Sequence, residues 1–109
     1  MILYLASPYS APHSAARRKR YEAAVFSAAS IIKERGEPVF SPIAHSHPIA
    51  LHALDGTWET WAEMDLAIIA LCRELVVLQL PGWEQSRGIA AEVAEAERLG
   101  IPVTYRSWP

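Results

Sequence analysis

Apolar runs separated by longer segments of helical pattern organise this chain. The runs at residues 2–6, 37–40, 74–80 and 101–105 are bounded by proline, glycine or serine, and they predict four β-strands. The run at 74–80 is the strongest because its leucines and valines are almost continuous. It therefore predicts a central strand.

Three helices are predicted, at about residues 13–35, 57–73 and 86–99. Gly36 and Gly100 follow the first and the last of them, and Thr57 and Ser86 stand where N-caps are expected. Residues 41–56 have no hydrophobic period and contain two prolines. This segment is predicted to be a long loop with room for one helical turn.

Continuous apolar strands that alternate with helices are typical of a parallel sheet covered on both faces. We therefore predict a small doubly wound, flavodoxin- or Rossmann-like α/β fold, with four to five strands in a single domain spanning residues 1–109. Ligands bind such sheets beyond the carboxyl ends of the strands. The loops at 7–12, 41–56 and 81–86 are expected to gather there.

Asp65 is a carboxylate on the apolar face of a predicted helix. A helical projection places it within about 60° of the residues Trp58, Trp61, Ile68, Ile69 and Cys72. A carboxylate in an apolar environment costs several kcal/mol unless it is hydrogen bonded or protonated. Asp65 is therefore either a functional group or a structural cap that bonds a neighbouring loop from inside the core.

Glu92 occupies an inward edge of the last predicted helix, beside Ala96 and Leu99. It could also be a half-exposed residue that compensates the helix dipole. Two inward carboxylates on different helices nevertheless suggest a shared site. Paired carboxylates that bracket one carbon cleave glycosidic bonds, one as the nucleophile and the other as proton donor or acceptor.

Composition narrows the class of protein. The 109 residues are 51% hydrophobic and 20% charged, with a formal net charge of −2, which excludes a disordered chain and a broad basic surface for nucleic acid. No apolar run approaches the roughly 18 residues of a membrane span. The single Cys72 is read as a buried inert thiol. We expect a soluble, cytoplasmic protein.

Several segments together resemble one known family. They are Tyr4-Leu5-Ala6-Ser7-Pro8-Tyr9-Ser10, Ser41-Pro42-Ile43, His45-Ser46-His47-Pro48, Asp65, Leu80-Pro81-Gly82-Trp83-Glu84 and Ser86-x-Gly88-x-x-x-Glu92. This pattern is similar to the DUF1937 family, a branch of the nucleoside 2-deoxyribosyltransferase-like superfamily, which also includes 5′-monophosphate N-glycosidases. The resemblance covers essentially the whole chain.

The resemblance implies a role for each matching residue. Glu92 would be the nucleophile, and Asp65 would handle the proton of the departing base. Ser86 and Gly88 would hold a 5′-phosphate at a helix start, and the loop with Ser7 and Tyr9 would close over the sugar.

The reaction implied is cleavage of the N-glycosidic bond of a nucleoside or nucleoside 5′-monophosphate, by a hydrolase or a transferase. It needs no cofactor, and its partners would be small nucleosides or nucleotides and further copies of the chain in a homodimer or homotetramer. Residues 83–88, Trp83-Glu84-Gln85-Ser86-Arg87-Gly88, depart from the pattern of the transferases, which have their usual acidic residue and Gly-Thr just ahead of the glutamate. The alternative is a nucleotide-binding module without turnover.

Histidines gather in the loop 41–56. His45 and His47 could contact substrate or have structural roles. A metal would need three or four converging ligands, and the spacing of His45, His47, His52 and Asp55 matches no zinc motif, so we expect none.

Two further candidates lie near the same edge of the predicted sheet. Arg17 is the first residue of a run of four cations and could reach a phosphate, although such a run is usually a solvated helix face. Trp83 follows the predicted turn at Pro81-Gly82, where it could stack on a base or belong to the core.

Overall fold

The computed structural model describes residues 1–52 and 58–108. Asp55 and the predicted cap Thr57 therefore lie outside the described residues. The elements are β1 (Ile2–Ala6), α1 (Ser14–Arg35), β2 (Val39–Phe40), α2 (Pro42–Ala50), α3 (Trp58–Ile69), β3 (Cys72–Gln79), the 3₁₀ turn η1 (Trp83–Gln85), α4 (Arg87–Arg98) and β4 (Val103–Ser107).

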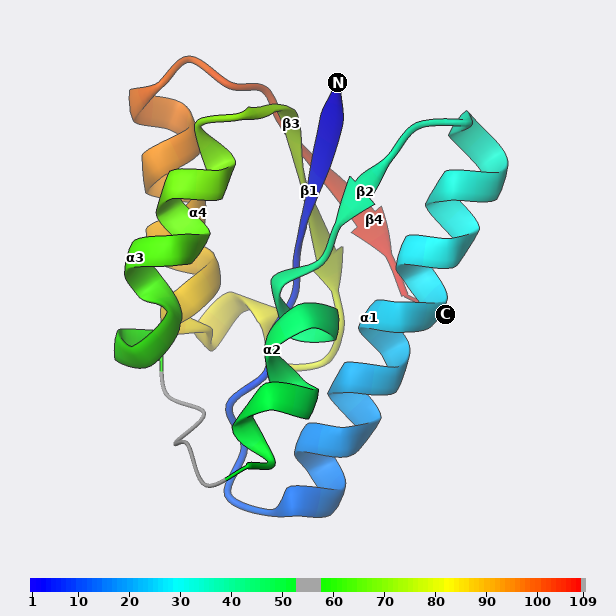
Figure 1. Ribbon diagram of the computed structural model, residues 1–109, viewed down its shortest axis with the longest axis vertical. Coiled ribbons are helices and arrows are strands. Elements are labelled where there is room, and N and C mark those ends of the chain that lie inside the picture. Colours follow the sequence, from blue (N-terminus) through cyan, green and yellow to red (C-terminus); the bar gives the residue numbers. More distant parts are fainter. Residues whose placement is uncertain (53–57, 109) are drawn as a thin grey trace.

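The four strands form one parallel sheet in the order β2-β1-β3-β4 (Figure 1). The chain winds from β1 to β2 on one side and then crosses to β3 on the other, so the winding direction reverses between β1 and β3. This is the flavodoxin-like order, in which ligands bind at the reversal point. The predicted α/β fold and the central position of β3 are confirmed.

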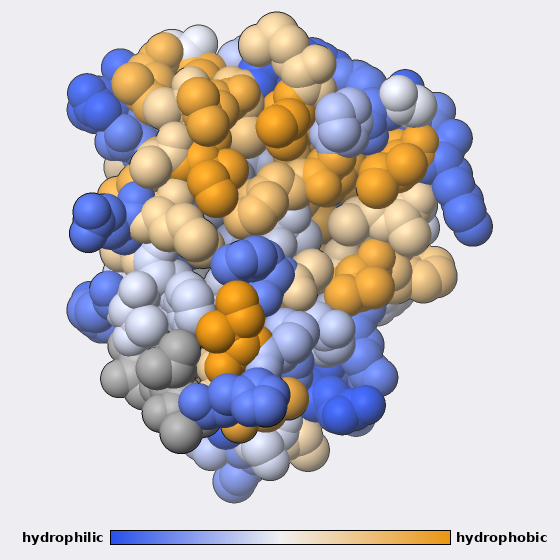
Figure 2. Space-filling view, viewed as in Figure 1, coloured by the Kyte–Doolittle hydropathy of each residue, from blue (hydrophilic) through white to orange (hydrophobic). Residues whose placement is uncertain are grey.

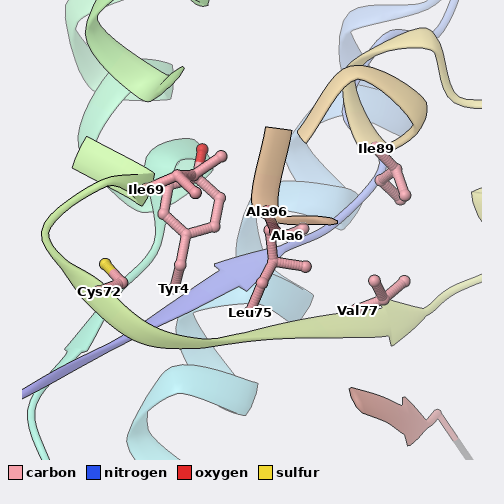
Figure 3. Packing of buried hydrophobic residues seen from close by; sticks show 8 residues of the cluster. All are labelled: Tyr4, Ala6, Ile69, Cys72, Leu75, Val77, Ile89 and Ala96. Atoms are coloured by element: carbon pink, nitrogen blue, oxygen red, sulfur yellow. The ribbon is translucent and has the colours of Figure 1, made fainter. Parts of the chain in front are cut away.

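Helices cover both faces of the sheet, as predicted. On one face, Tyr4 and Ala6 of β1 pack with side chains of β3, α3 and α4 (Figure 3). On the other face, Leu3 and Leu5 pack with β3 and with Ala23 and Ile31 of α1. The alternation along β1 thus sends Tyr4 toward the two helices that carry the predicted carboxylates.

Helix α2 corrects the prediction of a long loop. Ser41 caps it by accepting a hydrogen bond from the backbone N–H of Ala44 at 3.1 Å, and Pro42 occupies the first helical position. Pro48 lies inside the helix. Because Pro48 has no backbone N–H, the helix lacks one hydrogen bond at this residue.

Helix α3 ends four residues before the predicted boundary at residue 73. Cys72 already belongs to β3, where it pairs with Ile2 of β1. Pairing with β1 therefore overrides the helical pattern of residues 70–73. Helix α4 matches its prediction, with Ser86 as the N-cap and Gly100 in a left-handed conformation at φ 72°.

The surface differs between the two ends of the sheet. In the view of Figure 2, apolar side chains predominate in the upper half and hydrophilic side chains in the lower half, toward which the carboxyl end of β1 points. Among the described residues, no helix is long and apolar enough to cross a membrane.

Candidate active site

A cavity of about 1030 Å³ lies at the carboxyl ends of the strands, and all three predicted loop segments contribute to its wall. The structure brings together most of the site residues predicted from sequence. Those that line the cavity are Ser7, Tyr9, Arg17, His47, Asp65, Ser86, Gly88 and Glu92.

Glu92 is held on the inward face of α4. It is 3% exposed and lies on the same face as Ile89 and Ala96, whereas Leu99, which the projection placed beside it, follows the helix and is 39% exposed. The Tyr4 hydroxyl donates a hydrogen bond to Glu92 Oε2. One carboxylate oxygen is therefore fixed by a buried donor from the central sheet.

Tyr4 was not predicted as a site residue, because its run of apolar neighbours indicates only a core strand. A signal was nevertheless present. A tyrosine hydroxyl in a buried strand usually finds a partner, and strand alternation separates Tyr4 from Leu3 and Leu5.

Asp65 is 4% exposed and lies on the buried face of α3 together with Ile69. Its Oδ1 atom is buried and has no hydrogen-bond partner among the described residues. A structural cap is defined by the bonds that its oxygens accept, so this geometry does not favour the cap interpretation.

The two carboxyl groups titrate near neutral pH. Burial raises the pKa of Asp65 to about 7. Burial also raises the pKa of Glu92, to about 8; the Tyr4 hydrogen bond opposes this effect, and the charge of Asp65 adds to it. A carboxylic acid that holds its proton at pH 7 can act as a proton donor, so this pair is suited to acid–base chemistry.

The start of α4 forms another part of the wall. The Ser86 side chain accepts a hydrogen bond from the backbone N–H of Ile89 at 3.2 Å. The preceding N–H groups, of Arg87 and Gly88, have no acceptor within the helix. A Cβ at Gly88 would lie 3.4 Å from the ring of Trp58, an ordinary van der Waals distance, so the start of α4 packs against α3 at this residue.

Tyr9 and His47 contact each other at the cavity. Tyr9 Oη lies 2.6 Å from His47 Nδ1, and the His47 ring stacks on Tyr21 with centroids 4.3 Å apart. Burial and the nearby Arg18 and Arg17 lower the pKa of His47, which favours a neutral ring. His47 therefore joins the first loop to α2 and α1.

His45 and Trp83 do not line this cavity. His45 is exposed and lies against Phe40, and Trp83 packs against the core and Tyr105. Trp58 and Trp61, which share the apolar face of the helix with Asp65, do line the cavity. Among residues 1–52 and 58–108, no group of three or more histidine, cysteine or acidic side chains is arranged to hold a metal ion.

Comparison with known proteins places the chain in a family. The sequence model of DUF1937, described as a domain of unknown function, matches residues 1–107. The chain belongs to the DUF1937 family. A comparison with curated protein sequences finds no match.

A solved structure has the same fold as this DUF1937 protein. It belongs to a 2-deoxyribosyltransferase from the psychrotolerant bacterium Bacillus psychrosaccharolyticus, with a TM-score of 0.67 and 24% sequence identity. The match covers 98% of the present chain and 72% of the transferase. This likeness confirms the predicted fold.

Proposed function

We propose that this protein cleaves the N-glycosidic bond of a nucleoside, and preferentially that of a nucleoside 5′-monophosphate, as a hydrolase or a transferase. The observation that carries the proposal is the pair of buried carboxyl groups, Glu92 and Asp65, which come from different helices and line one cavity. The fold shared with a 2-deoxyribosyltransferase supports the same class of reaction.

In the proposed mechanism, Glu92 attacks the anomeric carbon. A bond from its carboxylate oxygen to that carbon forms as the bond to the base breaks, and the electron pair of the broken bond passes to the base nitrogen. Asp65 donates a proton to the departing base. Water, or a second base in a transferase, then attacks the anomeric carbon and releases Glu92, while Asp65 accepts the proton of the incoming group.

This reaction needs Glu92 ionised and Asp65 protonated. Burial raises the pKa of Glu92 to about 8 and that of Asp65 to about 7, so both carboxyl groups can hold a proton near neutral pH. The reactive form is the one in which the pair carries a single proton and that proton is on Asp65.

A nucleotide-binding module without turnover is the alternative. Such a module would use Ser86, Gly88 and Tyr9 but would place no demand on Glu92. Burial raises the pKa of both carboxyl groups, so their ionisation lowers the stability of the folded protein. A module that only binds nucleotide has no use for such a destabilising pair. The paired carboxyls therefore favour an enzyme.

Release of free base separates the two functions. The protein is incubated with a panel of nucleosides and 5′-monophosphates, and chromatography detects the base. Base released from at least one substrate is expected of the enzyme, whereas binding without release would support the module.

The homodimer or homotetramer implied by the resemblance stays a prediction. Light scattering, which measures the mass of the protein in solution, tests it.

We expect 5′-monophosphates to bind about 10- to 100-fold more tightly than the corresponding nucleosides. The first N–H groups of α4, which have no acceptor within the helix, and the helix dipole suit an anion, and hydrogen bonds to a charged group contribute about 1.5–3 kcal/mol. Calorimetry at fixed ionic strength measures both affinities. Equal or weaker binding of the monophosphates would remove the phosphate role from Ser86 and Gly88.

Tyr4→Phe is expected to move the acidic limb of the pH profile of kcat/KM to higher pH. The Tyr4 hydrogen bond lowers the pKa of Glu92, so its loss raises that pKa and decreases the fraction of ionised nucleophile at pH 7. We expect kcat/KM to fall roughly tenfold relative to the wild type at pH 7, and this difference from the wild type to be smaller at pH 9, where Glu92 is ionised in both proteins.

The matched control is Tyr105→Phe, which removes a tyrosine hydroxyl from the exposed edge strand β4. It should leave the profile unchanged. A uniform loss of activity for Tyr4→Phe at every pH would show that Tyr4 does not act through the ionisation of Glu92.

A further inference from the structure

Two arginines of α1, Arg17 and Arg20, donate hydrogen bonds to the backbone of the loop 7–12. Arg17 and Arg20 are three residues apart and share a helix face. Arg17 Nη1 donates to the backbone carbonyl of Ala11 at 2.7 Å, and Arg20 Nη1 donates to that of Ser10 at 2.6 Å. Both guanidinium groups therefore hold the backbone of the loop 7–12.

Arg20 also reaches a second segment. Its Nη2 donates to the backbone carbonyl of Pro81 at 3.2 Å. Pro81 follows β3, whereas Ser10 follows β1, and these two strands flank the point where the winding of the sheet reverses. The planar guanidinium of Arg20 thus joins the two loops that follow the central strands. A lysine ammonium cannot make both hydrogen bonds with the same fork geometry.

The Arg20 guanidinium lies directly beside the backbone of Gly82. A Cβ at residue 82 would lie 2.8 Å from Arg20 Nη2, which is closer than such atoms approach. Gly82 also has a φ of 91°, which favours glycine. The bare backbone at residue 82 therefore leaves the space that the guanidinium occupies.

We propose that Arg20 is a positioning residue that ties the loop 7–12 to the Pro81–Gly82 turn and thereby sets the affinity of the cavity for nucleotides. This inference rests on the proposed function. The first segment carries Ser7 and Tyr9, and the second leads through η1 to the start of α4 at Ser86. Arg20 thus fixes the separation of the sugar-binding and phosphate-binding walls.

The kinetic test compares Arg20→Ala, Arg20→Lys and the control Lys19→Ala. Lys19 is an exposed neighbour on α1 that does not line the cavity. We expect about a tenfold rise in KM for both Arg20 variants and a change in kcat within about threefold, because the backbone carbonyls that Arg20 holds belong to binding segments. Millimolar guanidinium ion should restore part of the affinity of Arg20→Ala. Wild-type kinetics for Arg20→Lys, or a loss confined to kcat, would overturn the proposal.

Hydrogen exchange tests the link without any substrate. Loss of Arg20 should speed amide exchange in residues 7–12 and also in residues 82–86, while Lys19→Ala should change neither segment. Unchanged exchange in either segment would overturn the link. If the wild-type protein releases no base, the proposed function fails, and the exchange experiment still decides whether Arg20 joins the two loops.

Discussion

Glu92→Gln is expected to abolish base release while the protein stays folded and still binds nucleotide. Glutamine keeps the size of the side chain and one oxygen that can accept the Tyr4 hydrogen bond, but its amide cannot form the glycosyl-enzyme. Single-turnover assays should show kcat reduced by at least about 10⁴-fold, which corresponds to about 5.5 kcal/mol of barrier. Glu92→Ala should lose turnover to a similar extent.

The same substitution should stabilise the protein at alkaline pH. Burial raises the pKa of Glu92 in the folded state, so the stability that its protonation contributes is present below the unfolded pKa near 4.5 and is lost as the pH rises through about 8. Glutamine does not ionise. The free energy of unfolding of Glu92→Gln at pH 8 should therefore exceed that of the wild type by about 1–3 kcal/mol.

Denaturant unfolding at pH 5 and pH 8 measures this difference in the free energy of unfolding, which should be smaller at pH 5.

More than a few per cent of wild-type base release by Glu92→Ala would remove Glu92 from the role of nucleophile. A control at Glu97, which lies on the exposed side of α4, should leave both turnover and the pH dependence of stability unchanged. Loss of turnover together with higher stability is the pattern of an active-site residue.

Local signals in the sequence were sufficient for most elements of the fold. The strand β1, the helix α1 with Gly36, and the cap Ser86 follow from short-range patterns, because each depends on residues that are adjacent along the chain. Helix α2 was not predicted because residues 41–56 have no hydrophobic period and contain Pro42 and Pro48. The pair Ser41-Pro42, a cap followed by proline at the first helical position, was a usable signal for it.

The inward positions of Asp65 and Glu92 were predictable because helical periodicity decides which side chains face a core. The partners of the other site residues were not. Arg17 and Arg20 bond backbone carbonyls of the loop 7–12, and backbone carbonyls carry no residue-specific signal in a sequence. The stacking of His47 on Tyr21 likewise depends on how α2 packs against α1.

Asp65→Asn separates a proton donor from a structural cap. If Asp65 only caps a loop, asparagine should keep most of the activity, while the protein loses about 1–3 kcal/mol of stability. If Asp65 protonates the departing base, asparagine cannot replace it. The barrier should then rise by about 3–5 kcal/mol, because general acid catalysis contributes roughly 10² to 10⁴ in rate.

Asp65 Oδ1 has no hydrogen-bond partner in the described part of the chain, and burial raises the pKa of Asp65; both observations favour the second outcome. Asp65→Asn should therefore remain folded and lose most activity on natural nucleotides. It should recover part of that activity on a nucleotide whose base leaves readily without protonation, because the missing proton then matters less. Steady-state kinetics of the wild type and of Asp65→Asn are measured on both kinds of substrate, together with the melting temperatures of the two proteins. A uniform loss for every leaving group, with a matching fall in melting temperature, would assign Asp65 to the structural role.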